Sequence, residues 1–197
     1  MGKRLFDLVA SGVGIVLLAP LMLAIAVAIK LESTGPVFFR QDRVGRFGVV
    51  FSIHKFRTMV SSADFTELQL TVGSDRRVTR VGAALRRFKL DELAQLIDVL
   101  VGDMSLVGPR PEVPRYVEHY PSDCREIILS VRPGITDWAS IYFRDESEML
   151  GRAADPELAY INQVLPIKTA YYVEYVRTAS FVGDVRIIAA TLGAIFR

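Results

Sequence analysis

Two adjacent carboxylates, Asp91 and Glu92, are the residues of this sequence best suited to chemistry. They lie within the segment LDEL (residues 90–93), whose leucines are three positions apart and predict a helix carrying both acids in its first turn. Unpaired backbone N–H groups and the helix dipole favour negative charge there, which predicts an ionised Asp91. An ionised aspartate can attack phosphorus or bind Mg²⁺. Acidic residues in a first helical turn are also ordinary capping residues, so the pair alone does not establish a site.

Cations elsewhere in the chain could complement these acids. Arg110 stands between Pro109 and Pro111, which fix the backbone on both sides and limit how the guanidinium can move. A planar guanidinium held in this way suits bidentate binding of a phosphate. Lys55 and Arg57 end a predicted strand and can point to one face. A Pro-Arg-Pro turn is also common as a rigid connection, so each element by itself is weak.

Composition excludes some classes of function. The chain has 197 residues and a formal net charge of +2, which is too small to indicate nucleic-acid binding. With a single cysteine, Cys124, and two distant histidines, an intrachain disulfide is impossible and the sequence argues against a structural zinc site. Positive charge is concentrated in a basic block that indicates anionic lipid, a phosphorylated substrate or a solvated helix face. This block consists of Arg76, Arg77, Arg80, Arg86, Arg87 and Lys89.

An uncharged stretch near the N-terminus predicts contact with lipid. Residues 8–29 number 22 and, at about 1.5 Å per helical residue, can cross a hydrocarbon core of roughly 30 Å. Pro20 predicts a kink near the middle. Basic residues flank both ends, so a straight span and a re-entrant hairpin with both ends in the cytoplasm stay open. A cleaved signal peptide is a third alternative, weakened because the apolar run continues past the small-residue motif at 24–26.

The remaining elements must position these groups. Residues 37–43 and 49–57 are rich in β-branched and aromatic residues, with Gly45 and Gly48 between them, and predict a β-hairpin. Helical patterns dominate elsewhere, so the expected fold class is a helix-rich α/β domain. The final amphipathic segment could pack on the core or lie on the bilayer. The expected helices cover residues 61–70, 82–87, 90–100, 112–120, 122–131, 156–165, 167–176 and 181–196, with an irregular stretch after residue 134.

Taken together, the motifs resemble the monotopic bacterial phosphoglycosyl transferases, the sugar transferase family that begins membrane glycoconjugate assembly. The resemblance extends over nearly the whole chain, and its most specific part is the joined motif at 90–111. The motifs are the proline-containing hydrophobic segment, GPVF (35–38), KFRTM (55–59), LDEL (90–93), GDMSLVGPRP (102–111), RPGIT (132–136) and the pattern at 180–191.

The resemblance implies an activity and a place for it. Sugar 1-phosphate would pass from a UDP-sugar to polyprenyl (undecaprenyl) phosphate with release of UMP. Asp91 would form a covalent phospho-sugar intermediate and bind Mg²⁺, and Glu92 would assist proton handling or metal positioning. Residues 1–34 would be a re-entrant membrane helix kinked at Pro20 with its junction, and residues 35–197 a catalytic domain on the cytoplasmic face of the bacterial inner membrane. Repulsion between anionic substrates and a carboxylate calls for Mg²⁺ and for the cations Lys55, Arg57, Arg86 and Arg110. The expected partners are the two substrates, the phospholipid membrane, and either a second copy of the chain or downstream glycosyltransferases. No nucleic-acid partner is expected.

Two places depart from the family pattern. The pattern Gly-Trp-Ala-Gln is replaced by Asp-Trp-Ala-Ser at 137–140, and Tyr172 stands where an aspartate is expected ahead of a tyrosine pair. Both changes concern sugar and nucleotide contacts and leave the acidic pair intact. Trp138 could stack on a uracil or sugar, or be a half-buried core residue. Asp137, Asp145 and Glu146 could hydrogen-bond a sugar or face solvent.

Two rival functions remain compatible with the residues. A membrane phosphatase or pyrophosphatase would release its aspartyl phosphate to water and would need no polyprenyl phosphate. A membrane-bound adaptor would use its cationic face to dock lipids or another protein. The adaptor predicts that Asp91→Asn is silent, because asparagine caps a helix nearly as well as aspartate does.

Overall fold

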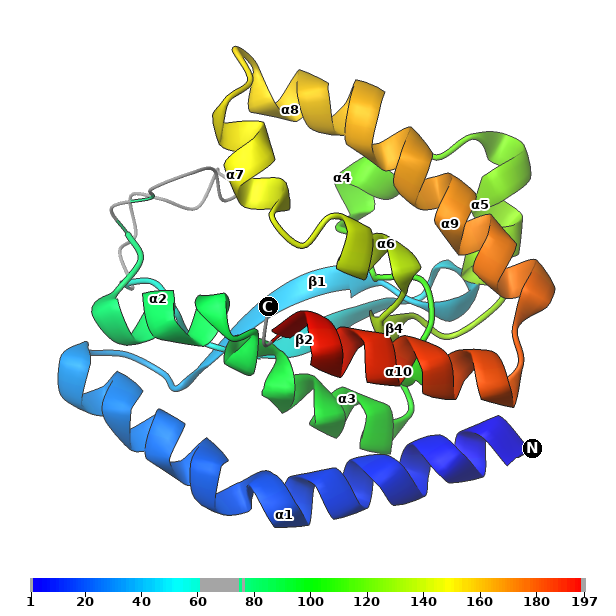
Figure 1. Cartoon of the computed structure of the whole chain (residues 1–197). Helices are drawn as coiled ribbons and strands as arrows, with labels where there is room; N and C mark the ends of the chain where they lie inside the picture. Colours follow the sequence, from blue (N-terminus) through cyan, green and yellow to red (C-terminus); the bar gives the residue numbers. More distant parts are fainter. Residues whose placement is uncertain (1, 61–74, 76, 196–197) are drawn as a thin grey trace.

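The computed structural model describes residues 2–60, 75 and 77–195. This part of the chain is a helix-rich α/β structure, as predicted, with an apolar N-terminal helix below the rest of the molecule in Figure 1. The predicted helix at 61–70 and Arg76 of the basic block lie outside the described residues. The helices are α1 (Gly2–Glu32), η1 (Arg46–Gly48), α2 (Arg80–Arg87), η3 (Leu90–Ala94), α3 (Gln95–Val101), α4 (Pro114–Val117), α5 (Ser122–Leu129), α6 (Trp138–Tyr142), α7 (Glu146–Gly151), α8 (Pro156–Ala159), η4 (Tyr160–Val164), α9 (Leu165–Thr178) and α10 (Phe181–Ile195).

The predicted hairpin is confirmed. Strands β1 (Phe38–Val44) and β2 (Val50–Phe56) pair antiparallel, with Phe38 opposite Phe56 and Val44 opposite Val50. The connection contains Gly48 at φ +79°, a left-handed conformation that glycine adopts without steric cost. The hairpin ends close to η3, so Lys55 near the end of β2 can reach the acidic pair.

The prediction of an irregular stretch after residue 134 is wrong in part. Strands β3 (Ser105–Val107) and β4 (Gly134–Thr136) form a parallel pair, and α6 and α7 follow. Strands of three residues are too short to show an alternating pattern, so no sequence pattern predicts them. A Cβ built on Gly134 would lie 2.1 Å from the Gly108 nitrogen, so glycine is required for this approach.

Several helices differ in extent from the prediction. The helix expected at 90–100 is a 3-10 helix, η3, followed by α3, and the helix expected at 112–120 shrinks to α4 at Pro114–Val117. The two helices expected at 156–165 and 167–176 run on without a gap as α8, the π-helix η4 and α9. Single-sequence patterns fix such boundaries only to within about two to four residues.

Helix α1 runs unbroken through Pro20 and exposes apolar side chains along most of its length. Among the described residues it is the one helix long and apolar enough to cross a membrane, with a mean hydropathy of 2.7 over its most apolar window. On its inner face, Ile25 and Ile29 pack in a core cluster with Phe56 and with Ala94 of η3. The helix that carries the acidic pair therefore rests directly on the predicted membrane segment.

The N-terminal end of α1 is held by polar contacts to the domain. Lys3 Nζ lies 2.6 Å from Oδ2 of Asp184 in α10, which is buried. Asp7, only 2% exposed, accepts hydrogen bonds from the Ser105 hydroxyl (2.8 Å) and from the Leu106 backbone N–H (3.2 Å). A buried carboxylate needs such partners, so these contacts fix this end of α1 on β3 and α10.

The C-terminal end of α1 is held by the same domain. Arg57, just after β2, donates to the Thr34 carbonyl (2.6 Å) and the Ser33 carbonyl (2.8 Å). Glu32 accepts from the backbone N–H of Arg80 at 2.8 Å, at the start of α2. Both ends of α1 therefore contact one compact domain, as Figure 1 shows.

Candidate active site

The acidic pair lies at the start of η3, directly after a strained residue. Lys89 has φ +54°, a left-handed conformation that is uncommon for a residue with a side chain, and it turns the chain from α2 into η3. Asp91 and Glu92 follow in the first turn of this 3-10 helix. The 3-10 turn directs the two neighbouring carboxylates to different surroundings.

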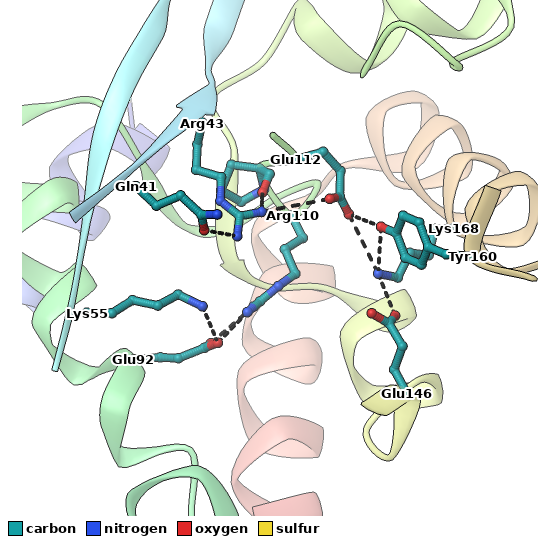
Figure 2. A network of polar contacts seen from close by, with 10 residues as sticks. Gln41, Arg43, Lys55, Glu92, Arg110, Glu112, Glu146, Tyr160 and Lys168 are labelled. Carbon is teal, nitrogen blue, oxygen red and sulfur yellow. Dashed lines mark hydrogen bonds and ion pairs between the residues drawn. The ribbon is translucent and has the colours of Figure 1, made fainter. Parts of the chain in front are cut away.

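Glu92 is the centre of an ion-pair cluster of Lys55, Glu92 and Arg110, which we call the Glu92 cluster (Figure 2). Arg110 grips both carboxylate oxygens, with Nη1 3.0 Å from Oε2 and Nη2 on Oε1, and Lys55 Nζ lies 3.3 Å from Oε1. Burial opposes ionisation of Glu92, but the charges of Arg110 and Lys55 outweigh it and hold the pKa of Glu92 well below its usual range. Glu92 is thus an ionised anchor for two cations.

Asp91 has a different environment. It is 9% exposed, and its Oδ1 is buried without a hydrogen-bond partner in the described part of the chain. Burial, with the nearby charge of Glu92, raises the pKa of Asp91 above its usual value, although Lys55, Arg86 and Lys89 act in the opposite direction. Desolvation therefore outweighs the short 3-10 turn in its effect on the pKa of Asp91, and the ionised state of Asp91 stays a prediction.

The donor set at Asp91 fits Mg²⁺. This ion usually keeps several waters and uses one or two protein carboxylates together with substrate phosphates. Within the described residues there is no group of three or more His, Cys, Asp or Glu side chains that could hold a metal by themselves. A single buried oxygen without a partner, on Asp91, is the kind of ligand such a shared site needs.

The other predicted cations are only partly brought together. Arg86 donates from Nε to the Thr58 hydroxyl at 2.8 Å and interacts electrostatically with Asp91. The sequence predicted that Arg57 and Lys55 point to one face, but the guanidinium of Arg57 does not join Lys55 there. It is 5% exposed and bonds the backbone at the end of α1, because Arg57 lies one residue beyond β2.

Sequence reasoning missed a second cluster, which follows the Pro-Arg-Pro motif directly. This Glu112 cluster consists of Arg43, Glu112, Glu146, Tyr160 and Lys168 (Figure 2). Glu112 accepts from the Tyr160 hydroxyl at 2.6 Å and lies 3.6 Å from Nζ of Lys168, which pairs with Glu146 at 2.6 Å. The only signal in the sequence was the position of Glu112 next to Pro111.

The two clusters hold opposite sides of the loop at residues 108–112 through ion pairs. Arg110 points to Glu92 and Glu112 points to Lys168, as Figure 2 shows. The loop backbone is fixed as well, because Gly134 donates to the Pro109 carbonyl at 2.9 Å and Arg43 donates to the Pro111 carbonyl at 2.9 Å. The prediction that Arg110 is rigidly positioned agrees with these contacts.

A cavity of about 330 Å³ opens beside the Glu92 cluster. One part of its wall is polar and the other is formed by aliphatic and aromatic side chains. Its lining residues are Lys89, Glu92, Leu93, Leu96, Arg110, Ile135, Thr136, Ser140, Ile141, Phe143, Arg144, Glu146, Ser147, Lys168, Thr191, Ala194 and Ile195.

The departures from the family pattern meet in the structure. Asp137 is buried and caps α6, accepting from the Ser140 N–H (3.0 Å) and hydroxyl (2.6 Å), so it does not face solvent. Tyr172 is fully buried, its hydroxyl has no partner in the described region, and burial and the charge of Asp137 raise its pKa well above the usual value. Trp138 is 44% exposed and thus half-buried, and its stacking on a ligand stays a prediction. Glu146 is ion-paired, and Asp145 is exposed.

Comparison with known proteins places this site in a family. The sequence matches the bacterial sugar transferase family over residues 1–197. It is 40% identical over 195 residues to a UDP-N-acetylgalactosamine-undecaprenyl-phosphate N-acetylgalactosaminephosphotransferase of Aeromonas hydrophila, covering 98% of this chain and 43% of the relative. It is also 40% identical over 195 residues to a UDP-glucose:undecaprenyl-phosphate glucose-1-phosphate transferase of Xanthomonas campestris pv. campestris, covering 97% and 38%. A protein of the same description from Caulobacter vibrioides is 38% identical over 193 residues, covering 96% and 68%.

The chain thus spans less than half the length of the first two relatives and about two thirds of the third. In all three the alignment covers nearly all of this chain, including the acidic pair and both ion-pair clusters. The chain belongs to the bacterial sugar transferase family.

Proposed function

We propose that this protein is a phosphoglycosyl transferase that moves a sugar 1-phosphate from a UDP-sugar to polyprenyl (undecaprenyl) phosphate and releases UMP. The observation that carries the proposal is Asp91, whose buried Oδ1 has no hydrogen-bond partner in the described part of the chain. It lies next to a cluster that holds Lys55 and Arg110 in place. The names of the relatives, which contain UDP-sugars and undecaprenyl phosphate, support these substrates.

The proposed reaction has two displacements at one phosphorus. First, an Asp91 carboxylate oxygen attacks the β-phosphorus, and the bond from that phosphorus to the bridging oxygen breaks, so UMP leaves with that oxygen and the electron pair. Next, a phosphate oxygen of the polyprenyl phosphate attacks the same phosphorus and the Asp91 carboxylate leaves. One phosphoanhydride replaces another through an acyl phosphate, so the exchange is close to thermoneutral and needs no net proton transfer.

The cations have separate proposed roles. Lys55, Arg86 and Arg110 offset the negative charge of the phosphates around Asp91, which otherwise repels both substrates. Arg57 positions the end of α1 through its backbone bonds. Asp91 would hold Mg²⁺ together with diphosphate oxygens, and the ion would supply charge neutralisation.

A re-entrant topology for α1 is the most economical proposal. A straight span would place Lys3 and Glu32 on opposite faces of the bilayer. In the structure, Lys3 contacts Asp184 and Glu32 contacts Arg80, and both partners belong to the same domain. A hairpin-like insertion bent at Pro20 keeps both ends and the catalytic domain on one face, which we propose is the cytoplasmic face of the inner membrane, where UDP-sugars are made.

Cysteine labelling tests this topology. In a Cys124→Ser background, Gly2→Cys and Thr34→Cys place single thiols at exposed positions at the two ends of α1. We expect a membrane-impermeant thiol reagent to label both positions in inside-out vesicles and neither in intact cells. Labelling of the two positions from opposite sides would rule the re-entrant topology out.

The reaction itself is tested by UMP release from a panel of UDP-sugars with undecaprenyl phosphate and Mg²⁺. We expect release beyond one UMP per enzyme molecule to require the lipid, and we expect all release to stop when divalent cations are chelated and to vanish in Asp91→Asn. Asp103→Asn removes the same charge at an exposed position of the neighbouring loop and should behave like wild type. Continued release without lipid, beyond one UMP per enzyme molecule, would favour the phosphatase, and full activity of Asp91→Asn would exclude Asp91 as the nucleophile.

A further inference from the structure

The cavity beside the Glu92 cluster combines two kinds of wall. Its polar part contains Arg110, Lys89 and Lys168, with Glu92 and Glu146 as their counter-charges. The other polar lining residues are Arg144, Thr136, Ser140, Ser147 and Thr191. Its apolar part comes from five separate elements, and its side chains offer no hydrogen bond to a sugar or a uracil. The apolar lining residues are Leu93 of η3, Leu96 of α3, Ile135 of β4, Ile141 and Phe143 in and after α6, and Ala194 and Ile195 of α10.

The apolar part of the cavity adjoins the predicted membrane segment. Leu96 Cδ1 lies 3.4 Å from the point where a Cβ on Gly14 would stand, so one side chain separates the cavity from the middle of α1. Phe6 of α1 and Phe181 of α10 also stack edge to face with centroids 5.1 Å apart. Figure 1 shows α3 and α10 on the side of the domain that faces α1. Helices α3 and α10 therefore both line the cavity and contact α1.

We propose that this cavity binds the phosphate end of the isoprenyl acceptor. The acceptor phosphate lies toward Lys89 and Arg110, and the first isoprene units lie against Leu96 and Ala194. This inference rests on the proposed function and adds the site at which the second substrate binds. A cavity of about 330 Å³ is at the low end for organic ligands, so it holds only the first units and the remaining chain stays in the bilayer.

The chemistry of the wall favours the acceptor over the donor. A UDP-sugar presents hydroxyls and amides around nearly its whole surface, and burying them against aliphatic side chains without partners is costly. An isoprenyl phosphate has one anionic end and an otherwise apolar body, which matches the division of the cavity wall. Two adjacent positions on α10 allow this match to be tested.

The test compares Ala194→Leu with Gly193→Leu. Leucine at 194 adds apolar volume to a lining residue, whereas a Cβ on Gly193 meets no atom within 4 Å and points into open space. Each purified variant is assayed for the KM of a ten-carbon isoprenyl phosphate and of undecaprenyl phosphate. Exchange of labelled UMP into UDP-sugar without any acceptor reports the first displacement separately, and it also shows that the variant is folded.

We expect Ala194→Leu to raise the KM of both acceptors about tenfold, the factor that corresponds to excluding roughly two methylene groups from an apolar site. UMP exchange should persist in this variant, and Gly193→Leu should resemble wild type in both assays. The short acceptor makes the result independent of docking on the bilayer.

Three results would overturn the inference. An unchanged acceptor KM with normal exchange would show that the acceptor does not use this cavity, and slowed exchange with a raised KM for UDP-sugar would assign the cavity to the donor. Equal losses in both leucine variants would also overturn it, because the loss would then not depend on the cavity wall. Absence of exchange in the wild-type protein would instead contradict the proposed covalent function, and this inference would fall with it.

Discussion

The Glu92 cluster and the Glu112 cluster hold the same loop, but they differ in whether the carboxylates in and beside them are all paired. In the Glu112 cluster, both Glu112 and Glu146 have cationic partners, and the Tyr160 hydroxyl completes the network. Beside the Glu92 cluster, the neighbouring Asp91 keeps a buried oxygen without a partner among the described residues. The Asp91 oxygen is therefore available to bind a ligand, whereas the carboxylates of the Glu112 cluster are already paired. We infer that the Glu112 cluster holds the loop and part of the cavity wall in place, and that the Glu92 cluster with Asp91 serves the reaction.

The largest effect is expected from Glu92→Gln, which breaks the Glu92 cluster. The amide no longer fixes Arg110 and Lys55 by charge, so the phosphates lose positioned cations and turnover should fall about 100-fold. Steady-state UMP release measures the loss, and exposed Glu118→Gln is the matched control. A Glu92→Gln enzyme with normal turnover would mean that the cluster has no part in the reaction.

Glu112→Gln should affect stability more than chemistry. It leaves the half-buried Arg43 without its carboxylate and removes one of the two carboxylates paired with the buried Lys168, so we expect a loss of about 3 kcal/mol in unfolding free energy. Glu148→Gln, which breaks an exposed pair with Arg152, should cost at most about 0.5 kcal/mol. Thermal or denaturant unfolding in detergent compares them. If Glu112→Gln lowered turnover per folded molecule as much as Glu92→Gln, the division between the two clusters would be wrong.

Gly134→Ala should disturb both clusters together. The added methyl would lie 2.1 Å from the Gly108 nitrogen and push on the loop that carries Arg110 and Glu112. Overpacking of this kind costs about 2 kcal/mol, and turnover should fall as well. Gly193→Ala, which meets open space in α10, should be neutral or slightly stabilising. A wild-type unfolding curve and turnover for Gly134→Ala would show that the loop is less rigid than its contacts indicate.

The smallest effect is expected at Tyr172. Its hydroxyl is buried without a partner in the described residues, so Tyr172→Phe should change the unfolding free energy by less than about 0.5 kcal/mol or raise it. Tyr175 is the matched case with partners, because its hydroxyl donates to the Val107 carbonyl and Asp184 at 3.0 and 2.9 Å. Tyr175→Phe should cost about 1–3 kcal/mol. Equal costs for the two variants would show that Tyr172 has a polar partner after all.

The fold was predictable where the sequence pattern is long or chemically marked. The hairpin followed from its β-branched and aromatic strands, α1 from its apolar length, and the rigid Arg110 from its two prolines. The β3–β4 pair was not predictable, because three-residue strands carry no period and their pairing depends on contacts between Gly108 and Gly134, 26 positions apart. The burial of Asp91 was not predictable for a similar reason, since it comes from elements remote in sequence.

At the site, residue identity was easier to predict than residue role. Lys55, Glu92 and Arg110 were singled out from local motifs, and the structure brings them together. Arg57 was singled out in the same way but holds α1, because one position beyond the strand changes where its side chain points. Lys168 was missed because a lysine in a helical pattern normally indicates solvent, whereas here it is 4% exposed and ion-paired.

The central claim is that Asp91 becomes covalently linked to the phospho-sugar. Its most direct test is intact-protein mass spectrometry after incubation with UDP-sugar and Mg²⁺ in the absence of acceptor, followed by peptide mapping. We expect the wild-type mass to rise by that of one sugar phosphate, with the label on Asp91, and to return to its starting value when polyprenyl phosphate is added. A label on another residue, or the same mass increase in Asp91→Asn, would contradict it.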